Sequence, residues 1–348
     1  MDLKDIQWGE FVFEDIFNIF STNSSIDKNK LSTKRGEIPY ITRSEKNNAI
    51  DYFVCNQDKK YVVDNGNVIT IGLDTQTVFY QSHKFYTGQN IQILSNDKIN
   101  YFNAQFLIPL IKRQMGKFSW GGNGATLTRL RRSKIILPIT PEGEPDYAFM
   151  EQFMQEKEQE KLEKFQNYVS KRIDEVKDFQ AVEPLNEKEW GEFFIESVFK
   201  IKAGKRLTKS DMKKGSRPFI GASDSNNGIT SYVSNMNASI DSNVLGVNYN
   251  GSVVENFYHP YKALFSDDVK RLSLKEIDGN EYLYLFTKTI ILKQKSKFQY
   301  AYKFNESRML RQKILLPINQ EGNPDYDYME NYIKKLEFEK LMKYLSLK

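Results

Sequence analysis

Hydrophobic and polar positions alternate along this chain in short runs, and the complete pattern occurs twice, roughly 180 residues apart. Trp8-Gly9-Glu10-Phe11 near the start returns as Trp190-Gly191-Glu192-Phe193. Residues 135–139 and 142–147 return in the same order as residues 314–318 and 321–326. The pattern therefore indicates a duplicated domain, each copy followed by its own terminal segment.

Each copy reads as a set of short strands separated by turn residues. An apolar strand (residues 10–20 and 192–202) is followed by a long polar loop (residues 21–35 and 203–217). Further strands are expected at residues 38–42, 68–73 and 77–80, and at residues 218–222, 244–249 and 252–254. Helices are expected near residues 103–117 and 281–293. The pattern predicts a twisted, mainly antiparallel sheet or partial barrel in each copy.

Each copy ends in a helix with a clear start signal. Pro145-Asp146 and Pro324-Asp325 place a proline and a carboxylate where a helix N-terminus favours both. Apolar residues then recur at a spacing of about 3.5. We expect these stripes to pack as an antiparallel coiled coil, roughly 45 Å long for 30 residues, or against partner subunits, through Met150, Met154, Leu162, Phe165, Val169, Ile173, Met329, Ile333, Leu336 and Leu341.

The predicted fold class is therefore α+β, with two similar β-rich domains separated by long amphipathic helices in a pseudo-twofold arrangement. The expected boundaries are a first domain at residues 1–144 and its terminal helix at residues 145–183. A second domain at residues 184–323 and a second, shorter helix at residues 324–348 follow. Two domains suit a chain of 348 residues, because a single core of that size is uncommon.

Composition narrows the class of protein. The chain is 40% hydrophobic and 27% charged, which is typical of a globular protein. No apolar run is long enough to span a bilayer, and the acidic start lacks the pattern of an export signal. The single cysteine, Cys55, excludes an internal disulfide and is expected to be a small buried residue. These features predict a cytoplasmic protein that does not contact membranes.

Basic residues gather at the same place in both copies. The net charge is only +5, but residues 98–141 and residues 282–305 contain no acidic residue. Two basic domains at the ends of a helical spacer suit duplex DNA, whose half-sites lie about 34 Å apart per helical turn. Lysine and arginine bind phosphates, whereas specificity requires side chains that reach base edges. Segments that differ between the copies, such as residues 119–124 and 299–303, are the candidates for base reading.

The candidate DNA-binding residues combine these basic stretches with the first polar loops. An asymmetric bipartite target is predicted, because different loops should read different bases. In the first copy the candidates are Lys28, Lys30, Lys34, Arg35, Lys112, Arg113, Lys117, Trp120, Asn123, Arg129, Arg131 and Arg132. In the second copy they are Lys205, Arg206, Lys209, Lys213, Lys295, Lys297, Tyr300, Tyr302, Lys303, Arg308 and Arg311.

Catalytic signatures are missing from the sequence, so no catalytic residue, cofactor or metal is expected. Asn323-Pro324-Asp325-Tyr326 resembles the clamp that methyltransferases use for a flipped base, but its counterpart Glu144-Pro145-Asp146-Tyr147 indicates a helix start. His83 and His259 lie at corresponding places and are expected to fill hydrogen-bonded packing roles. Neither domain contains a second histidine with which to bind zinc.

The order of these motifs resembles the specificity subunit of type I restriction-modification systems. That order comprises a Trp-x-x-Phe opening, a polar loop, residues 36–41, an Asn-Asn-x-Ile turn, a basic region, residues 314–318 and a Pro-Asp-Tyr helix. The resemblance implies two target-recognition domains and two spacer helices. It also implies DNA adenine methyltransferase subunits and a motor nuclease subunit as partners. The same module occurs in related systems in which methylation and cleavage share one polypeptide.

The resulting hypothesis is a non-catalytic DNA-recognition subunit that reads an asymmetric bipartite site and recruits methyltransferase and endonuclease subunits. One alternative is an enzyme that modifies or cuts nucleic acid by itself, although the constellations it needs are not found. Another is a scaffold that uses the two domains to bind proteins without DNA, which leaves the paired basic regions unexplained.

Overall fold

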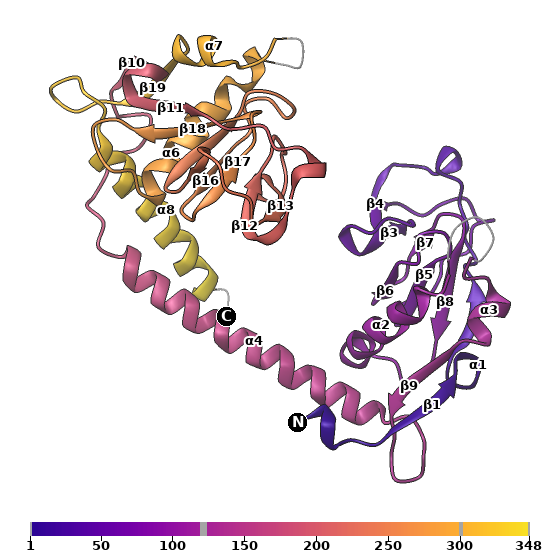
Figure 1. Ribbon diagram of the computed structural model, residues 1–348. Helices are drawn as coiled ribbons and strands as arrows, with labels where there is room; N and C mark the ends of the chain where they lie inside the picture. The colour runs from indigo at the N-terminus through magenta and orange to yellow at the C-terminus, as the bar shows by residue number, and fades with distance from the viewer. Residues whose placement is uncertain (1, 119–123, 299–301, 347–348) are drawn as a thin grey trace. The chain divides into compact units, whose positions relative to one another are not determined.

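The computed structural model describes residues 2–118, 124–298 and 302–346, and the chain divides into two compact units, Met1–Gln166 and Asn167–Lys348 (Figure 1). The strands of the first unit are β1 (Trp8–Val12), β2 (Asn18–Ser21), β3 (Arg35–Ile41), β4 (Ile50–Val54), β5 (Val68–Gly72), β6 (Val78–Gln81), β7 (Tyr86–Thr87), β8 (Ile91–Ser95) and β9 (Lys134–Pro138). Its helices are α1 (Phe13–Ile16), α2 (Tyr101–Met115) and α3 (Leu127–Arg131), with short 3-10 turns η1 (Leu3–Asp5), η2 (Lys28–Lys30) and η3 (Asn47–Ala49).

The second unit repeats this series. Its strands are β10 (Trp190–Phe194), β11 (Phe199–Ala203), β12 (Lys214–Ile220), β13 (Ile229–Val233), β14 (Ile240–Asp241), β15 (Val244–Asn248), β16 (Asn256–His259), β17 (Ala263–Phe265), β18 (Val269–Leu274) and β19 (Lys313–Pro317). Its helices are α5 (Ile195–Val198), α6 (Glu281–Leu292), α7 (Glu306–Leu310) and α8 (Tyr326–Ser346), with η4 (Lys209–Asp211), η5 (Asn226–Gly228) and η6 (Lys293–Lys297). The long helix α4 (Tyr147–Val176) begins in the first unit and ends in the second.

Each unit contains three small sheets in place of the single sheet or partial barrel that the sequence predicted. The first unit has the ribbon β1-β9, the four-stranded sheet β2-β8-β5-β6 and the three-stranded sheet β4-β3-β7. The second has β10-β19, β11-β18-β15-β16 and β13-β12-β17-β14 in the same roles. Most pairs are antiparallel, but β3 pairs with β7 and β12 with β17 in parallel. The predicted α+β class with two similar β-rich units is confirmed.

Four predicted segments were wrong in detail. The opening strands at residues 10–20 and 192–202 are each interrupted by a helical turn, α1 or α5, whose Phe13 or Ile195 is fully buried. The loop expected to extend to Arg217 ends at Lys213, because β12 begins at Lys214. Residues 252–254 form a turn in which Val254 has a φ of 70°, and the strand β16 follows it.

A duplicated bulge explains one retained glycine in each unit. Arg35 and Ile38 both face Val54, and Lys214 and Arg217 both face Val233, so the strand carries extra residues at the same point in both copies. A Cβ on Gly36 would lie 2.4 Å from the backbone N of Cys55. A side chain therefore cannot be accommodated there without moving the partner strand.

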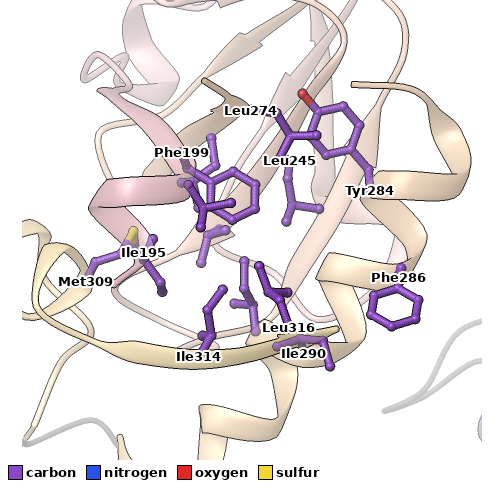
Figure 2. Close-up of a cluster of buried hydrophobic side chains, with 14 of the residues drawn as sticks. Ile195, Phe199, Leu245, Leu274, Tyr284, Phe286, Ile290, Met309, Ile314 and Leu316 are labelled. Atoms are coloured by element: carbon purple, nitrogen blue, oxygen red, sulfur yellow. The ribbon is translucent and has the colours of Figure 1, made fainter. Parts of the chain in front are cut away.

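The main core of each unit lies between its four-stranded sheet and its helix α2 or α6. The central strand β5 is buried along its whole length, which explains its apolar sequence. Figure 2 shows the equivalent cluster of the second unit, in which Phe199 and Leu245 from the sheet meet Tyr284 from α6 and Ile314 from β19. Each such buried side chain contributes about 1.5–3 kcal/mol relative to an exposed one.

The helix starts predicted from Pro-Asp are confirmed. Asp146 accepts a hydrogen bond from the backbone N–H of Phe149 at 2.9 Å, and Asp325 accepts one from Tyr328 at 2.9 Å. Both aspartates therefore cap the first turn of their helix, α4 or α8. The segment around Asn323 is a helix start and not a base clamp, as the comparison of the two copies indicated.

Candidate nucleic-acid interface

The polar loop of the first unit is held by a buried carboxylate beneath it. Asp64 is 1% exposed and accepts hydrogen bonds from the backbone N–H of Asn23 at 2.9 Å and from Ser24 Oγ at 3.1 Å. Thr22 Oγ1 also donates to Asp64. A carboxylate this deeply buried must be satisfied by such donors, so the loop has a fixed start.

The lysines and arginine predicted in this loop are exposed beyond that anchor. Lys28 Nζ lies 3.0 Å from Asp51 Oδ2 and 5.1 Å from the centroid of the Tyr52 ring. The hydrogen bond from Lys28 to Asp51 raises the pKa of Lys28, which therefore keeps its charge. Lys30, Lys34 and Arg35 are exposed near the β3-β4 end of the unit.

The end of each loop is held by a side-chain amide from the segment after β4 or β13. In the first unit Gln57 accepts a hydrogen bond from the backbone N–H of Ser32 at 2.9 Å and donates one to the carbonyl of Ser32 at 3.1 Å. In the second unit Asn235 accepts a hydrogen bond from the backbone N–H of Lys213 at 2.7 Å and donates one to the carbonyl of Asp211 at 2.9 Å. Lys205, Lys209 and Lys213 are exposed, and Arg206 NH1 lies 3.6 Å from Asp267. The two loops therefore occupy the same place in the fold, and similar amide contacts hold their ends.

The position of Asp64 is also occupied by a carboxylate in the second unit, with a different partner. Asp64 bridges Phe85, and Asp241 pairs with Ala263 at the same point of the equivalent sheet. Asp241 Oδ2 accepts a hydrogen bond from Arg271 NH1 at 2.9 Å, and Arg271 is only 6% exposed. The counterpart of Arg271 in the first unit is Ile93. Ile93 pairs with the third residue of β5, and Arg271 pairs with the equivalent residue of β15. One acidic position is thus retained while its hydrogen-bond donors have changed.

The basic residues at the end of α2 and α6 and in the segments that follow fall into two groups. Some donate hydrogen bonds to backbone carbonyls, and the others have exposed side chains. Arg129 NH1 donates to the carbonyl of Gly124 at 3.0 Å, and its counterpart Arg308 donates to the carbonyl of Lys303 at 2.7 Å. Arg131 donates to the carbonyl of Ile19 at 3.1 Å. The side chain of Lys303 is half-buried, and the other predicted basic side chains of these segments are exposed: Lys112, Arg113, Lys117, Arg132, Lys295, Lys297 and Arg311.

Acid-free segments of the sequence do not form acid-free surfaces. Glu255, from the turn before β16, forms an ion pair with Lys295. Glu306 lies 2.6 Å from Lys270 at the start of α7. In Figure 1 the β3-β4 sheet, which carries Arg35, lies at the upper end of the first unit, and α3, which carries Arg129 and Arg131, lies lower, so the predicted basic residues lie on separate elements.

An aromatic stack lies beside the second basic segment. The ring of Tyr302 is stacked on Phe298 at a centroid distance of 5.7 Å and an angle of 9°. The guanidinium carbon of Arg308 lies 3.7 Å from the centroid of the Tyr302 ring. Tyr302 remains 48% exposed although Phe298 and Arg308 both lie against its ring. Trp120, Asn123 and Tyr300 were also predicted contacts, and they lie outside the described residues.

Sequence reasoning missed one pair of exposed aromatic residues. Phe53 on β4 is 53% exposed and Tyr232 on β13 is 54% exposed, and the two occupy the same strand position. An aromatic residue within an apolar strand is expected to face the core, so only its retention in both copies could have indicated a surface role. Both residues lie on the small sheet next to the basic loops.

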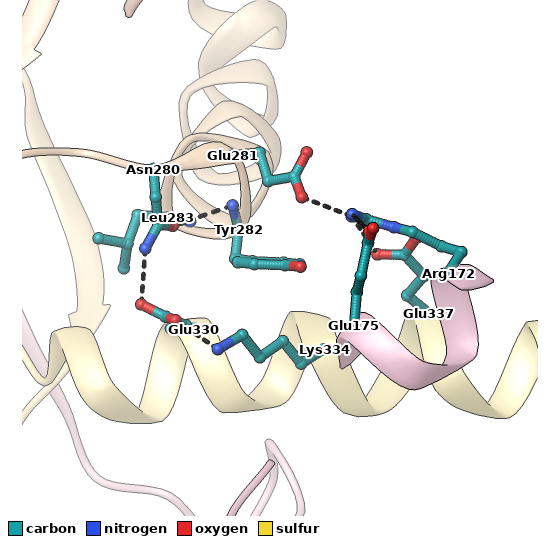
Figure 3. Close-up of polar contacts among 9 residues, drawn as sticks. All are labelled: Arg172, Glu175, Asn280, Glu281, Tyr282, Leu283, Glu330, Lys334 and Glu337. Atoms are coloured by element: carbon teal, nitrogen blue, oxygen red, sulfur yellow. Dashed lines mark hydrogen bonds and ion pairs between the residues drawn. The ribbon is translucent and has the colours of Figure 1, made fainter. Parts of the chain in front are cut away.

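The last turns of α4 are fixed to the second unit by a polar network. Figure 3 shows Arg172 of α4 between three carboxylates, with its Nε 2.6 Å from Glu337 of α8 and its NH1 2.9 Å from Glu175. Its NH2 contacts Glu281 at the start of α6 at 2.5 Å. The hydrogen bond that Arg172 donates to Glu337 is the largest of the contacts that raise the pKa of Arg172. These contacts connect the spacer helix to the second unit.

The apolar side chains predicted to form the stripes of α4 and α8 differ in how deeply they are buried. Met150, Val169 and Met329 are fully buried, and Met154 and Ile333 pack against the unit cores. Ile173, Leu336 and Leu341 are half-buried. Leu162 and Phe165 are 39% and 46% exposed.

The histidines are not equivalent, contrary to the prediction. Val68 of β5 pairs with Gln81, and Val244 of β15 pairs with His259, so the counterpart of His259 is Gln81. His259 is fully buried, which lowers its pKa to about 4, and its Nδ1 lies 3.4 Å from the Tyr261 hydroxyl. His83 is exposed. Cys55, expected to be buried, is half-exposed.

Within residues 2–118, 124–298 and 302–346, no group of three His, Cys, Asp or Glu side chains is arranged to hold a metal ion. Among the helices of that same part of the chain, none combines the length and the apolar composition needed to cross a bilayer.

Comparison with known proteins identifies the family. The sequence profile of the type I restriction modification DNA specificity domain matches residues 6–166 and again residues 187–347. The chain is 43% identical over 333 residues to S.BcgI, the specificity subunit of a type II restriction enzyme from Heyndrickxia coagulans, with 95% of each protein covered. It is similar in fold to the crystal structure of a type I restriction-modification S subunit from M. genitalium, with a TM-score of 0.55 and 17% identity over 99% of this chain and 93% of that one. The chain therefore belongs to the type I restriction-modification DNA specificity family, and it is a restriction-modification specificity subunit with one copy of the family's domain in each unit.

Proposed function

We propose that the chain is the non-catalytic DNA-recognition subunit of its system and that it reads an asymmetric site made of two half-sites. The carrying observation is that the two units share their framework strand by strand, while the starts of their loops are held by unlike polar groups, residues 22–24 on Asp64 in one and Arg271 on Asp241 in the other. A shared framework presents both loops in the same way, and unlike loops select unlike bases.

Phosphate contacts are assigned to the exposed basic residues of the loops and of α3 and α7. In the first unit these include Lys30, Lys34, Arg35 and Arg132, and in the second Lys205, Lys209, Lys213 and Arg311. Stacking contacts are assigned to Phe53 and Tyr232, whose side chains are 53% and 54% exposed. Tyr302 remains a candidate DNA contact. Trp120, Asn123 and Tyr300 remain candidates for base reading in the divergent segments.

The catalytic partners are proposed to be DNA adenine methyltransferase subunits, joined by an endonuclease or motor subunit where the system also restricts DNA. The half-exposed Leu162 and Phe165 of α4 offer apolar area for such subunits. The remaining helical positions, among them Met150 and Val169, hold the helices to the units.

A second candidate differs only in the organisation of the partner. The relative that is 43% identical is the specificity subunit of a type II restriction enzyme, whereas the solved structure of similar fold comes from a type I system. This identity favours a partner in which one polypeptide both methylates and cleaves DNA. Purification of the complex distinguishes the two candidates by the number of different catalytic chains that it contains.

The decisive experiment maps methylated adenines across the host genome with and without this gene. The proposal expects one interrupted, asymmetric motif to lose its methylation when the gene is deleted, and to regain it when the gene is returned. A methylation pattern unaffected by the deletion would contradict the proposal. In parallel, the affinity of the purified complex for its site should fall linearly with salt on logarithmic axes, because phosphate contacts release counterions.

A further inference from the structure

An aromatic side chain faces solvent at the same strand position in both units. Phe53 of β4 is 53% exposed, and Tyr232 of β13 is 54% exposed. The two strands have the same pattern of burial, and the next residue, Val54 or Val233, belongs to the hydrophobic core of the small sheet while the aromatic residue does not. Core packing therefore does not explain why both copies place an aromatic residue here.

Two adjacent cations have been kept beside each aromatic residue. Exposed Lys34 and Arg35 in the first unit correspond to exposed Lys213 and Lys214 in the second. Arg35 and Lys214 each pair with the residue that follows the aromatic one on the neighbouring strand. In the first unit Phe53 and Arg35 also line one hollow of about 590 Å³. An aromatic ring beside cations is suited to a nucleotide, because the ring can stack on its base while the cations bind phosphates.

Other side chains of the same strands differ between the units. Asp51 and Tyr52, which precede the aromatic residue, correspond to Thr230 and Ser231. The Asp51 carboxylate lies 3.0 Å from Lys28 Nζ, so its charge is balanced within the first unit. Side chains that select bases must differ between unlike half-sites, whereas an aromatic residue and cations that stay alike should contact a feature that both half-sites share.

Two unlike half-sites share two features whatever their sequences. Both have a phosphate backbone, and an adenine that is to be methylated must leave the base stack before a methyltransferase can reach it. The departure of a base leaves a gap between its neighbours, and proteins that distort DNA insert apolar side chains at such steps. An aromatic ring can stack on any base, because every base has a π-face. The same type of side chain can therefore serve both half-sites.

The aromatic residues are also held firmly enough to act as wedges. Each lies on a paired strand and not on the variable loop, and a side chain on a strand is positioned more precisely than one on a loop. Backbone pairing continues beyond the aromatic residue in both units. The N–H of Cys55 donates to the carbonyl of Lys34 at 3.0 Å, and the N–H of Ser234 donates to the carbonyl of Lys213 at 2.8 Å.

We propose that Phe53 and Tyr232 each stabilise the distorted half-site from which the target adenine has left the stack, by stacking on a base that remains there. The neighbouring cations hold the phosphates of the distorted strand. The inference rests on the proposed function, because it requires a partner that methylates adenine. Each unit thus takes part in the methylation step as well as in the reading of its half-site.

The test uses the assembled complex and a duplex that contains the site found by methylation mapping. At saturating DNA, Phe53→Ala should lower the methylation rate of one half-site by on the order of tenfold, and Tyr232→Ala should do so in the other half-site only. A fluorescent analogue, 2-aminopurine, replaces one target adenine at a time and brightens when it leaves the stack. The increase in its fluorescence should be smaller in the same half-site that each variant methylates slowly.

A mismatched base opposite the target adenine separates this role from a structural one. An unpaired adenine leaves the stack more readily, so the mismatch should return the methylation rate of Phe53→Ala to within about threefold of wild type. A ring that only supported the fold would not respond to the mismatch. Phe53→Tyr, which installs the residue of the second unit, should also restore the rate on the matched duplex.

Matched controls shorten exposed apolar side chains elsewhere in the two units. Val62 and Met236 are 57% and 78% exposed, and Val62→Ala and Met236→Ala should methylate both half-sites at the wild-type rate. Native mass spectrometry of each variant measures whether the complex with the modification subunit still assembles.

The inference is overturned if Phe53→Ala and Tyr232→Ala methylate both half-sites at the wild-type rate, or if each slows both half-sites equally. It is also overturned if the mismatch restores nothing, or if the variants no longer bind the modification subunit, since the aromatic residues would then be protein contacts. A wild-type complex that methylates no adenine would instead refute the proposed function itself.

Discussion

Replacement of Arg172 by alanine would remove the central cation of the network in Figure 3. The guanidinium is 17% exposed and contacts Glu175, Glu281 and Glu337, whose side chains are 46%, 42% and 26% exposed. Without it, three carboxylates would face one another across α4, α6 and α8. The second unit should therefore become less stable, and the end of α4 should be held to it less firmly.

The expected cost lies between two limits. Breaking a fully buried ion pair by removing one partner costs about 3–5 kcal/mol. An exposed pair is worth about 0.2–1 kcal/mol. Because Arg172 is mostly buried while its partners are a quarter to a half exposed, we expect a loss of about 2 kcal/mol. For a domain of this size that corresponds to a fall in Tm of about 4–8 °C.

The assay is differential scanning calorimetry of the full chain, combined with hydrogen exchange to locate the change. Exchange should become faster in α8 and in the last turns of α4, with no change in the first unit. Lys164→Ala is the matched control, because Lys164 forms an ion pair with Glu160 on the same helix while remaining 72% exposed. That variant should be indistinguishable from wild type.

The reasoning would be refuted if Arg172→Ala unfolded at the wild-type temperature with unchanged exchange in α8. A destabilisation that appeared equally in Lys164→Ala would refute it as well, because it would reflect loss of helical charge and not loss of the network.

Three further predictions follow from single contacts. His259→Gln, which installs the residue found at the equivalent Gln81, should flatten the pH dependence of the free energy of unfolding. Burial lowers the pKa of His259 to about 4, so between pH 6.5 and 4 this histidine is protonated only in the unfolded chain. The wild type should therefore lose up to about 1.4 kcal/mol of stability for each pH unit by which the pH falls in that range. Thermal unfolding across that range measures this, and equal slopes for the two proteins would count against it. Asp146→Ala should destabilise the first turn of α4 by about 1 kcal/mol in chemical denaturation, whereas Asp146→Asn should retain the cap; equal losses in both would exclude a capping role. Tyr232→Ser should weaken DNA binding by the assembled complex about fivefold or more in fluorescence anisotropy, with Met236→Ser as the unaffected control; unchanged affinity would remove Tyr232 from the interface.

Much of the fold was predictable because the duplication displays each pattern twice. Buried strands such as β5 are apolar along their length, and the turn at Asn47-Asn48 and Asn226-Asn227 uses the residues that tolerate positive φ. The segment at residues 252–254 was mistaken for a strand because Val253 and Val254 are buried although they lie in a turn. A hydrophobic pattern cannot distinguish apolar residues that are buried in a turn from those that are buried in a strand.

The equivalence of His83 and His259 failed for a geometrical reason. The segment from Val68 to its partner Gln81 is two residues shorter than the segment from Val244 to its partner His259. A change of loop length shifts every later residue in a linear comparison, and only the strand register reveals the true counterpart.

The candidate interface was less predictable than the fold. Basic stretches can be read from the chain, but the carboxylates that neutralise them come from elsewhere, as Glu255 does for Lys295. Phe53 and Tyr232 look like core residues of a strand until their exposure is known. Which face a side chain occupies is a tertiary property, and the local pattern determines it only where the strand alternates clearly.

The acidic residue beneath each loop, Asp64 or Asp241, constrains how new target preferences can arise. Asp64 depends on hydroxyl and amide donors from residues 22–24, whereas Asp241 depends on Arg271, which is supplied by a neighbouring strand. A loop transplanted alone from one half to the other would leave its recipient's acid without the donors it needs, or bring hydroxyls to a site already neutralised by a guanidinium. New DNA specificities should therefore arise by exchange of a whole recognition domain and seldom by exchange of a loop alone.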